Sequence, residues 1–397
     1  MRILQIVPSI SLVYGGPSQM VRSLSKALAD RGVDLTVVTT DSNGDSGQPP
    51  LDVPLDRPVP QDGYQVRYFR CSPFRRYKFS PKLLGWLWQN AGEFDLAHIH
   101  ALFSPLSTAT ATVARTRQLP YILRPLGTLD PADLRKKKRL KQVYVKLLEG
   151  ANIAGAAALH FTSEREAEIS ERFGAETRDL VIPLGVESPE PVADVGDYLN
   201  QLQVKGDETE PLILFLSRVE PKKGLELLIP ALEKIWDGGG RFRFVLAGAN
   251  PQDPDYDRQI RERIARSPLA GQTTLTGFVT GKAKTALLQV ADLFVLPSYY
   301  ENFGIAVAEA MVAGTAVAIS NGVHIWPQVE QAGGGWVSNC EIDEIATMIQ
   351  TALGDRDELR RRGALARDYA LEHYSWGAIA EQMIGAYEDI LRYRQRQ

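Results

Sequence analysis

Short apolar runs alternate with amphipathic helical patterns along the chain, and this alternation most constrains the fold. Ile3–Val7 predicts a buried strand, Gly15-Gly16-Pro17 predicts a turn, and Val33–Thr39 predicts the next strand. Between the turn and the second strand, apolar residues recur at helical spacing: Met20, Val21, Leu24, Ala27 and Leu28. A strand, a helix and a second strand in this order favour a right-handed parallel crossover.

The same alternation occurs in two series, separated by residues 188–210, which predict a linker or an irregular domain entry. Further strands of the first series are expected at Leu96–His100, Tyr121–Arg124, Ala158–Thr162 and Leu180–Pro183. Strands of the second are expected at Leu212–Ser217, Phe242–Ala247, Thr273–Gly277, Leu293–Pro297 and Ala316–Ser320, with helices at Lys223–Trp236, Tyr256–Ala265, Lys282–Ala291 and Ile305–Ala313. We therefore predict an α/β fold with two doubly wound, Rossmann-like parallel-sheet domains facing a cleft.

Composition excludes several classes of protein. The 397 residues are 44% hydrophobic and 23% charged, as in ordinary globular chains. Cys71 and Cys340 lie far apart in no CxxC pattern, which argues against a disulfide framework or a zinc site and fits a reducing cytosol. The apolar run at the N-terminus is too short for a signal peptide, and no window holds the ~20 apolar residues of a membrane span. We expect a cytoplasmic protein that is soluble or at most attached to a membrane surface.

The stretch that follows the predicted strand Leu293–Pro297 carries the strongest site signal. It reads Tyr299 to Gly304 and leads into the helix Ile305–Ala313. Ligands of open α/β sheets bind at the carboxyl ends of the strands, and a helix N-terminus suits a phosphate. Glu301 precedes this helix, and Glu309 lies about one turn inside it, where it could accept hydrogen bonds from ribose hydroxyls. The alternative is a solvated Glu301 and an ordinary surface Glu309.

Two further loops follow predicted strands. Arg218 and Lys223 could converge on a diphosphate and stabilise a leaving nucleoside diphosphate without a metal, although an exposed basic loop is the alternative. Gly15 and Gly16 do not form the GxGxxG dinucleotide fingerprint. They could still let backbone N–H groups approach a phosphate or sugar, or they could simply make a turn.

His98 and His100 lie two positions apart on the predicted strand Leu96–His100. We expect either that one points to each face, or that the strand end releases His100 toward the cleft. We favour His100 as a cleft residue contacting donor sugar or acceptor, over a structural histidine satisfied within the core. A zinc pair is disfavoured because no third ligand is near in sequence.

Two other segments leave alternatives open. Asp253-Pro254-Asp255-Tyr256-Asp257 has the D-x-D spacing of a cation site, but its Pro-rich setting favours a solvated turn and helix cap. Residues 134–148 hold seven cations and no acid. Their apolar stripe consists of Leu140, Val143, Tyr144, Leu147 and Leu148. This helix could lie on an anionic membrane surface or dock its stripe on the core. No nucleic-acid motif occurs, and the net charge is −3, so we expect no nucleic-acid partner.

Several motifs, in order and spacing, resemble family 4 of the retaining glycosyltransferases nearly end to end. They are the Gly15-Gly16 loop, Asp95–His100, Val181–Val186, Ser217-Arg218 with Lys223-Gly224, and above all Glu301-Asn302-Phe303-Gly304-Ile305 with Ala306–Ala310. The resemblance implies the GT-B fold, retention of anomeric configuration, and no metal or other cofactor. It also implies an acceptor-side domain over residues 1–190, joined by a C-terminal helix at 376–397, and a nucleotide-sugar-binding domain over 205–375.

The resemblance further implies roles for individual residues. Glu301 would contact the donor sugar and help catalysis, Glu309 would bind the ribose, and His100 would lie near the reacting centre. Arg218 and Lys223 would hold the diphosphate, aided by backbone groups at Gly15, Gly16, Asn302, Phe303, Gly304 and Ile305. The sequence departs from the family at Asn321 and His324, where a glycine pair and an acidic residue are usual, which leaves the donor sugar open. At the end of another strand, Arg124 is our hypothesis for binding an anionic or saccharide acceptor.

We therefore expect transfer of a hexose from a nucleotide sugar to a saccharide or lipid-linked acceptor, in polysaccharide or glycolipid synthesis. A UDP-sugar is favoured over a GDP-sugar as the donor. One alternative is a nucleotide-sugar epimerase of the same fold, which needs no acceptor. The other is a non-catalytic module that binds nucleotide or sugar.

Overall fold

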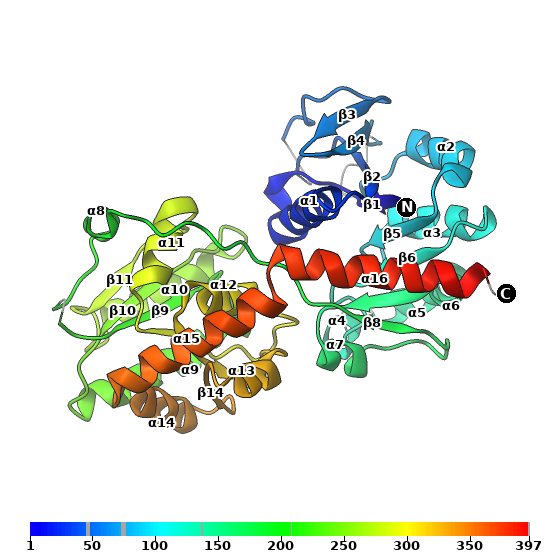
Figure 1. Cartoon of the computed structure of the whole chain (residues 1–397). Coiled ribbons are helices and arrows are strands. Elements are labelled where there is room, and N and C mark those ends of the chain that lie inside the picture. Colours follow the sequence, from blue (N-terminus) through cyan, green and yellow to red (C-terminus); the bar gives the residue numbers. More distant parts are fainter. Residues whose placement is uncertain (45–47, 73–76, 136–137, 208, 396–397) are drawn as a thin grey trace. The chain divides into compact units, whose positions relative to one another are not determined.

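A computed structural model of the chain describes residues 1–44, 48–72, 77–135, 138–207 and 209–395. The chain packs as two compact units. The first comprises Met1–Gly185 and Trp376–Gln397, and the second comprises Val186–Ser375. Each unit has its own sheet (Figure 1).

The first unit is built on an eight-stranded sheet in the order β3-β4-β2-β1-β5-β6-β7-β8. Its strands are β1 (Arg2–Ile6), β2 (Asp34–Thr40), β3 (Pro58–Gln61), β4 (Tyr64–Phe69), β5 (Leu96–His100), β6 (Tyr121–Arg124), β7 (Ala158–Phe161) and β8 (Asp179–Val181). Neighbouring strands run parallel except β3, which pairs antiparallel with β4 at the edge. Every residue of β5, β6 and β7 is buried, as expected for strands covered on both faces.

Helices cover this sheet. They are α1 (Gly16–Ala29), α2 (Pro81–Asn90), α3 (Pro105–Thr116), α4 (Pro131–Arg135), α5 (Lys138–Tyr144), α6 (Gly150–Ala154), α7 (Glu164–Ile169) and α16 (Trp376–Gln395), and a π-helical turn joins α5 to α6 at Val145–Glu149. The apolar face of α1 and that of α16 share one core with strands β1 and β2. Met383 and Tyr387 of α16, both fully buried, belong to that core. The end of the chain is therefore an integral part of the first unit (Figure 1).

The second unit has a six-stranded sheet in the order β11-β10-β9-β12-β13-β14, with every neighbouring pair parallel. Its strands are β9 (Leu212–Leu216), β10 (Arg243–Ala247), β11 (Thr273–Leu275), β12 (Leu293–Leu296), β13 (Ala316–Ser320) and β14 (Gly335–Ser338). Its helices are α8 (Val195–Gln201), α9 (Leu225–Asp237), α10 (Pro254–Ala265), α11 (Gly281–Val290), α12 (Ile305–Ala313), α13 (Trp326–Ala332), α14 (Ile342–Leu353) and α15 (Arg356–His373). The strand order reverses between β9 and β12, which is the topological switch point of a doubly wound sheet.

The α/β class and the two doubly wound sheets are as predicted, and each predicted strand and helix is present with ends shifted by a few residues. Sequence reasoning missed β3, β4 and β14. The short β3 contains two prolines, which removes backbone donors and is tolerated at a sheet edge. Residues 188–210 also hold the short helix α8, and the second unit begins at Val186 rather than at residue 205.

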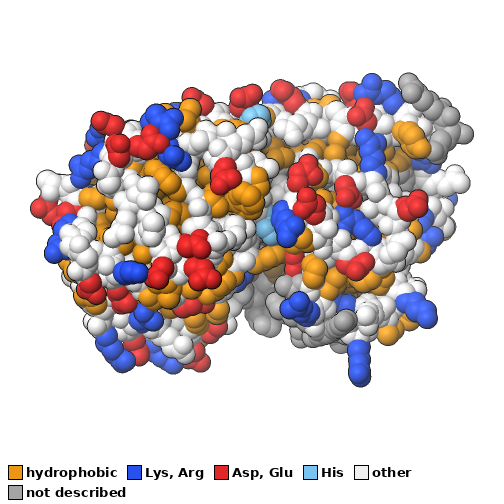
Figure 2. All heavy atoms as spheres, turned by 90° about the horizontal axis from the view of Figure 1, so that it is seen from below, with side chains coloured by type: hydrophobic (Ala, Val, Ile, Leu, Met, Phe, Trp, Pro, Cys, Tyr) orange, Lys and Arg blue, Asp and Glu red, His pale blue; other side chains and the backbone are white. Residues whose placement is uncertain are grey.

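Charged side chains of both signs occur on one face of the molecule. On the face shown in Figure 2, Lys and Arg side chains are interspersed with Asp and Glu side chains. Within the part of the chain that is described, no helix is long and apolar enough to cross a bilayer.

Candidate active site

The two loops that carry the strongest sequence signals meet at the switch point of the second unit. One follows β9 and holds Arg218 and Lys223; the other follows β12 and holds Glu301. Their strands are neighbours, and the Tyr299 N–H donates to the Lys222 carbonyl at 2.9 Å. Gly224 makes the close approach possible. Its φ is +71°, and a Cβ there would lie 2.1 Å from the Pro297 carbonyl oxygen.

Lys223 and Glu301 form an ion pair across these loops, between Nζ and Oε2. The lysine side chain is 8% exposed and the glutamate 20%. The backbone of Glu301 is held on both sides, since its N–H donates to the Gly322 carbonyl and its carbonyl accepts from the His324 N–H, each at 2.9 Å. Glu301 is therefore a positioned and paired carboxylate, and the solvated alternative is wrong.

The helix that follows opens toward the same loops. Gly304 is the N-cap of α12 with φ +80°, and it supplies no side-chain cap. The positive end of the helix dipole and the first-turn N–H groups, including that of Ile305, are therefore suited to an anion. The neighbouring side chains are engaged elsewhere, because Phe303 is buried against Tyr374 and Asn302 accepts a hydrogen bond from the Tyr300 hydroxyl. Only backbone groups of Phe303 can meet a ligand.

Glu309 lies one turn inside α12, as predicted, and its Oε1 is 2.7 Å from Nζ of Lys284 on α11. Both side chains remain partly exposed, at 22% and 31% respectively. Sequence reasoning missed Lys284, because nothing in a helix with scattered lysines shows which one faces a neighbouring helix. The contact with Lys284 orients the Glu309 carboxylate, which was predicted to accept hydrogen bonds from ribose.

Arg218 and Lys223 share one loop but contact different carboxylates. The Arg218 guanidinium is 2.7 Å from Glu220 Oε1, and its side chain is 55% exposed. Arg218 is therefore accessible, whereas Lys223 is almost buried beside Glu301. The structure brings together these two loops, the start of α12 and Glu309 in the second unit. Gly15, Gly16, His100 and Arg124 belong to the first unit.

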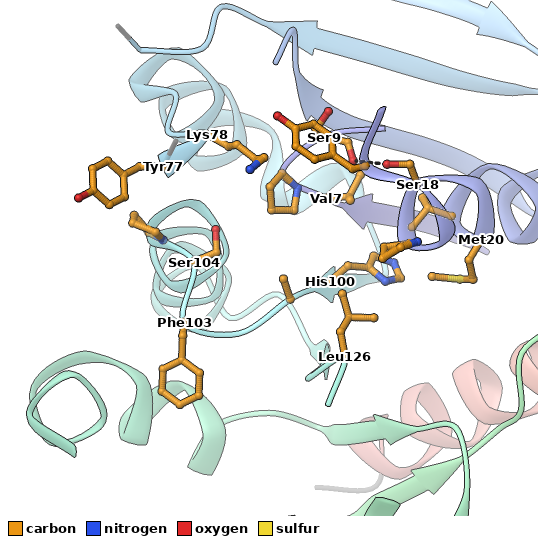
Figure 3. A pocket seen from close by; sticks show the side chains of 16 residues that line it. Val7, Ser9, Ser18, Met20, Tyr77, Lys78, His100, Phe103, Ser104 and Leu126 are labelled. Atoms are coloured by element: carbon orange, nitrogen blue, oxygen red, sulfur yellow. Dashed lines mark hydrogen bonds between the residues drawn. The ribbon is translucent and has the colours of Figure 1, made fainter. Parts of the chain in front are cut away.

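In the first unit, a cavity of about 330 Å³ lies at the corresponding switch point, between the loops that follow β1 and β5. Val7, Ser9, Tyr14 and Pro17 line it from one side of the switch point, and His100, Ala101, Phe103 and Ser104 from the other. Figure 3 shows His100 with Met20 and Leu126 at one side of this cavity and Tyr77 at the opposite side. Gly15 and Gly16 sit between the lining residues Tyr14 and Pro17, at the start of α1.

The prediction that His98 and His100 point to opposite faces is wrong. Residues two apart on a strand share a face, and the two rings stack with centroids 4.6 Å apart. Both are buried. His98 Nδ1 is 2.9 Å from the Tyr387 hydroxyl, and His100 Nε2 is 2.5 Å from Gln5 Oε1. His98 is thus a satisfied core histidine, whereas His100 also borders the cavity.

Arg124 is 3% exposed and is not among the residues that line the cavity. Its Nη1 donates to the sulfur of Met20 at 2.7 Å. Burial lowers the pKa of this guanidinium to about 10. In this structure the side chain is closed off from an acceptor, because the strand end that carries it is covered.

Residues 253–257, which have the D-x-D spacing, begin a helix. Asp253 caps α10 by accepting from the Tyr256 N–H at 3.2 Å, as predicted. Within the described residues, no group of three or more His, Cys, Asp or Glu side chains could hold a metal ion.

Among the described side chains of the predicted stripe in segment 134–148, Tyr144 contacts the first unit and three others are exposed. Val143, Leu147 and Leu148 are 54%, 71% and 51% exposed, while Val145 is buried and Tyr144 bonds to Thr108. The π-helical turn rotates the residues that face the core. Residues 136–137 and the side chain of Leu140 lie outside the described part.

Comparison with known proteins agrees with this architecture. Residues 15–185 match the glycosyl transferase 4-like domain, and residues 200–368 match the glycosyl transferases group 1. The chain is 27% identical to phosphatidyl-myo-inositol mannosyltransferase of Mycobacterium tuberculosis over 98% of this chain and 97% of that protein. It is 31% identical to the uncharacterised glycosyltransferase MJ1607 of Methanocaldococcus jannaschii, over 46% of this chain and 45% of that protein.

A solved structure has the same fold. Anabaena HepE, in complex with UDP and glucose, superposes with a TM-score of 0.74 at 21% identity, covering 98% of this chain and all of that one. The two doubly wound sheets are thus those of a GT-B protein.

Proposed function

The chain belongs to the group 1 glycosyltransferases, and on that basis we propose that it transfers a hexose from a nucleotide sugar with retention of anomeric configuration and without a metal. The observation that carries the proposal is the Lys223–Glu301 ion pair at the switch point, beside the uncapped start of α12. A diphosphate needs cationic and N–H donors there, and a donor sugar needs an acceptor for its hydroxyls. This corner of the second unit supplies both.

The chemistry follows from where charge develops. As the bond between the anomeric carbon and the diphosphate breaks, negative charge grows on the leaving phosphate oxygen. Arg218, Lys223 and the N-terminus of α12 would stabilise that charge electrostatically. Glu301 would contact the sugar hydroxyls, while Glu309, oriented by Lys284, would accept from the ribose.

The partners are proposed from the relatives. HepE holds UDP and glucose, which supports a UDP-sugar over a GDP-sugar as the donor. The mannosyltransferase named for phosphatidyl-myo-inositol supports a lipid-linked acceptor beside a saccharide one. The exposed Val143, Leu147 and Leu148, near the basic Lys146, support attachment to the inner face of a membrane by a cytoplasmic protein.

The test is a panel of UDP- and GDP-sugars in EDTA, with saccharide and lipid acceptors, following released nucleoside diphosphate. We expect wild type to turn over one donor and Glu301→Gln to lose about 10²- to 10³-fold in kcat. Glu262→Gln is the matched control, because that carboxylate is exposed on α10 beside Arg266. It should retain wild-type turnover.

Three outcomes would contradict the proposal. Turnover that requires an added divalent cation would remove metal independence. Conversion of the donor into another nucleotide sugar would show an epimerase. Binding of a nucleotide sugar without release of nucleoside diphosphate in the presence of any acceptor tried would show a non-catalytic binding module.

A further inference from the structure

Three of the five histidines are buried together in the first unit, with two partners from opposite ends of the chain. His98, His100 and His160 are each at most 2% exposed. Gln5 of β1 and Tyr387 of α16 contact them, although these two partners are 382 positions apart. The arrangement bears on the cavity because His100 lines it.

The hydrogen-bonded chain begins at a group that can only accept. His160 Nε2 is 2.9 Å from the Ile182 carbonyl oxygen, so Nε2 must carry the hydrogen. In a neutral ring, the other nitrogen is then an acceptor. His98 Nε2 lies 3.2 Å from His160 Nδ1 and must therefore be the donor in that contact.

The same rule sets each following link. His98 Nδ1 is left as an acceptor, and the Tyr387 hydroxyl donates to it at 2.9 Å. The hydroxyl oxygen in turn accepts from Gln5 Nε2 at 3.1 Å. This orientation turns the Gln5 carbonyl toward His100, whose Nε2 donates to it at 2.5 Å. His100 Nδ1 is left with a lone pair.

The neutral state of the three rings has a physical cause. Burial is the largest cause and lowers the pKa of all three, and the buried Arg124 guanidinium lowers each pKa further. Neighbouring histidines also lower the pKa of His98 and His100, while the hydrogen bond to the Ile182 carbonyl acts in the opposite direction on His160. The charged group facing this cluster is thus a cation, which opposes protonation. Tyr387 stays a neutral hydroxyl because burial raises its pKa.

We propose that this chain of five hydrogen bonds, from the Ile182 carbonyl to His100 Nε2, holds His100 as its Nε2–H tautomer and leaves an unpaired acceptor, Nδ1, on a residue that lines the cavity. Gln5, Tyr387, His98 and His160 are then positioning residues. His100 Nδ1 has no hydrogen-bond partner among the described residues and is shielded from solvent. An unsatisfied buried acceptor is costly, and a ligand O–H would satisfy it.

The inference also names the ligand group, and in this part it rests on the proposed function. A lone pair accepts from a neutral hydroxyl and repels a phosphate or carboxylate oxygen. His100 should therefore contact a saccharide hydroxyl and not the diphosphate. Cationic and N–H donors suited to a phosphate occur in the second unit, at Arg218, Lys223 and the start of α12.

The direct test is NMR of the full chain labelled with ¹⁵N-histidine, using long-range couplings from the ring carbons' protons to both ring nitrogens. His324→Gln and His373→Gln identify the other two signals. We expect His98, His100 and His160 to show protonated Nε2 and bare Nδ1 between about pH 6 and 8, a range in which an ordinary histidine titrates. An Nδ1–H tautomer or a charged ring at any of the three would overturn the proposal.

Tyr387→Phe breaks the chain while keeping the aromatic ring in the core. We expect His100 to lose its single tautomer, because Gln5 is then free to reverse its amide. Tyr121→Phe is the matched control, since Tyr121 is buried in the same unit and its hydroxyl donates to the Asn152 carbonyl at 2.7 Å. An unchanged His100 tautomer in a folded Tyr387→Phe protein would contradict the relay. If that variant does not fold, the wild-type spectrum still decides.

Titration separates the relay from the proposed function. Adding UDP-glucose should shift the His100 Nδ1 resonance toward that of a hydrogen-bonded acceptor, whereas UDP alone should leave it in place. If UDP produces the same shift, the assignment of a saccharide hydroxyl is wrong. If no nucleotide binds but the tautomers are as expected, the proposed function fails and the relay stands.

Discussion

At the scale of single residues, the candidate site is a set of charges that hold one another in place. Glu301 and Glu309 each contact a lysine, Lys223 and Lys284 respectively. Neither carboxylate is fully buried, so each can exchange its contact for a ligand without a large desolvation cost. The pairs orient the carboxylates before a nucleotide arrives, which lowers the entropy lost on binding.

Glu309→Gln should weaken UDP binding by about 10- to 100-fold, because a charged acceptor contributes roughly 1.5–3 kcal/mol to a hydrogen bond. Calorimetric titration with UDP measures this. Lys284→Met should weaken binding less, since Glu309 remains charged but is no longer oriented. The loss of UDP binding free energy in the double variant should then be smaller than the sum of the losses in the two single variants. Strictly additive losses would show that Lys284 does not act through Glu309.

At the scale of elements, the site depends on how closely two strand-to-helix turns approach. The turn from β9 to α9 passes Gly224 against the Pro297 carbonyl, and the turn from β12 to α12 passes Gly304 in the left-handed region. A side chain at Gly224 would push these turns apart. The Lys223–Glu301 pair lies beside this contact, so a substitution that separates the two turns would also disturb the ion pair.

Gly224→Ala should destabilise the protein by about 1–3 kcal/mol and weaken donor binding, since the new Cβ is strained both by the positive φ and by the carbonyl. Gly271→Ala is the control, because no atom lies within 4 Å of a Cβ there and its φ is not positive. Urea unfolding and UDP titration measure both effects. If the two variants behave alike, the close approach does not matter for stability.

At the scale of the whole molecule, the first unit joins both ends of the chain around buried histidines. Their pKa values are lowered in the folded state, to about 3 for His160, by burial first and then by the Arg124 guanidinium and, for His98 and His100, by neighbouring histidines. The unfolded chain therefore binds more protons than the folded one below about pH 6.5. The contribution of these histidines to the free energy of unfolding is fully present above about pH 6.5. It is lost as the pH falls toward their folded-state pKa values.

Lowering the pH from about 7 to 5 should therefore reduce the free energy of unfolding, by up to about 1.4 kcal/mol per pH unit for each histidine below pH 6.5. Urea midpoints at several pH values measure the slope. The three histidines together account for part of the slope of the free energy of unfolding against pH, and His160→Gln should remove about a third of that part. His373→Gln, at an exposed position, should leave the slope unchanged. A slope that His160→Gln leaves unchanged would be evidence against the buried neutral state.

Much of this protein could be predicted from its sequence. Buried parallel strands are continuous apolar runs, so Leu293–Leu296 and Leu212–Leu216 were located within a residue or two. Glu301 and Lys223 were chosen as candidate site residues because ligands collect where such strands end, a rule that needs only the order of elements, and the structure pairs the two side chains. These patterns lie within short stretches of sequence, so they can be recognised without knowledge of the three-dimensional structure.

Only the tertiary structure decided which side chains meet. Lys284 faces Glu309 because α11 lies beside α12, and Arg124 is closed off because Met20 of α1 covers it. The tautomer of His100 depends on Gln5 and Tyr387, which approach only when the last helix packs on the first strand. Side-chain pairing across the sheet is a property of register and packing, and a linear pattern of apolar and polar residues contains neither.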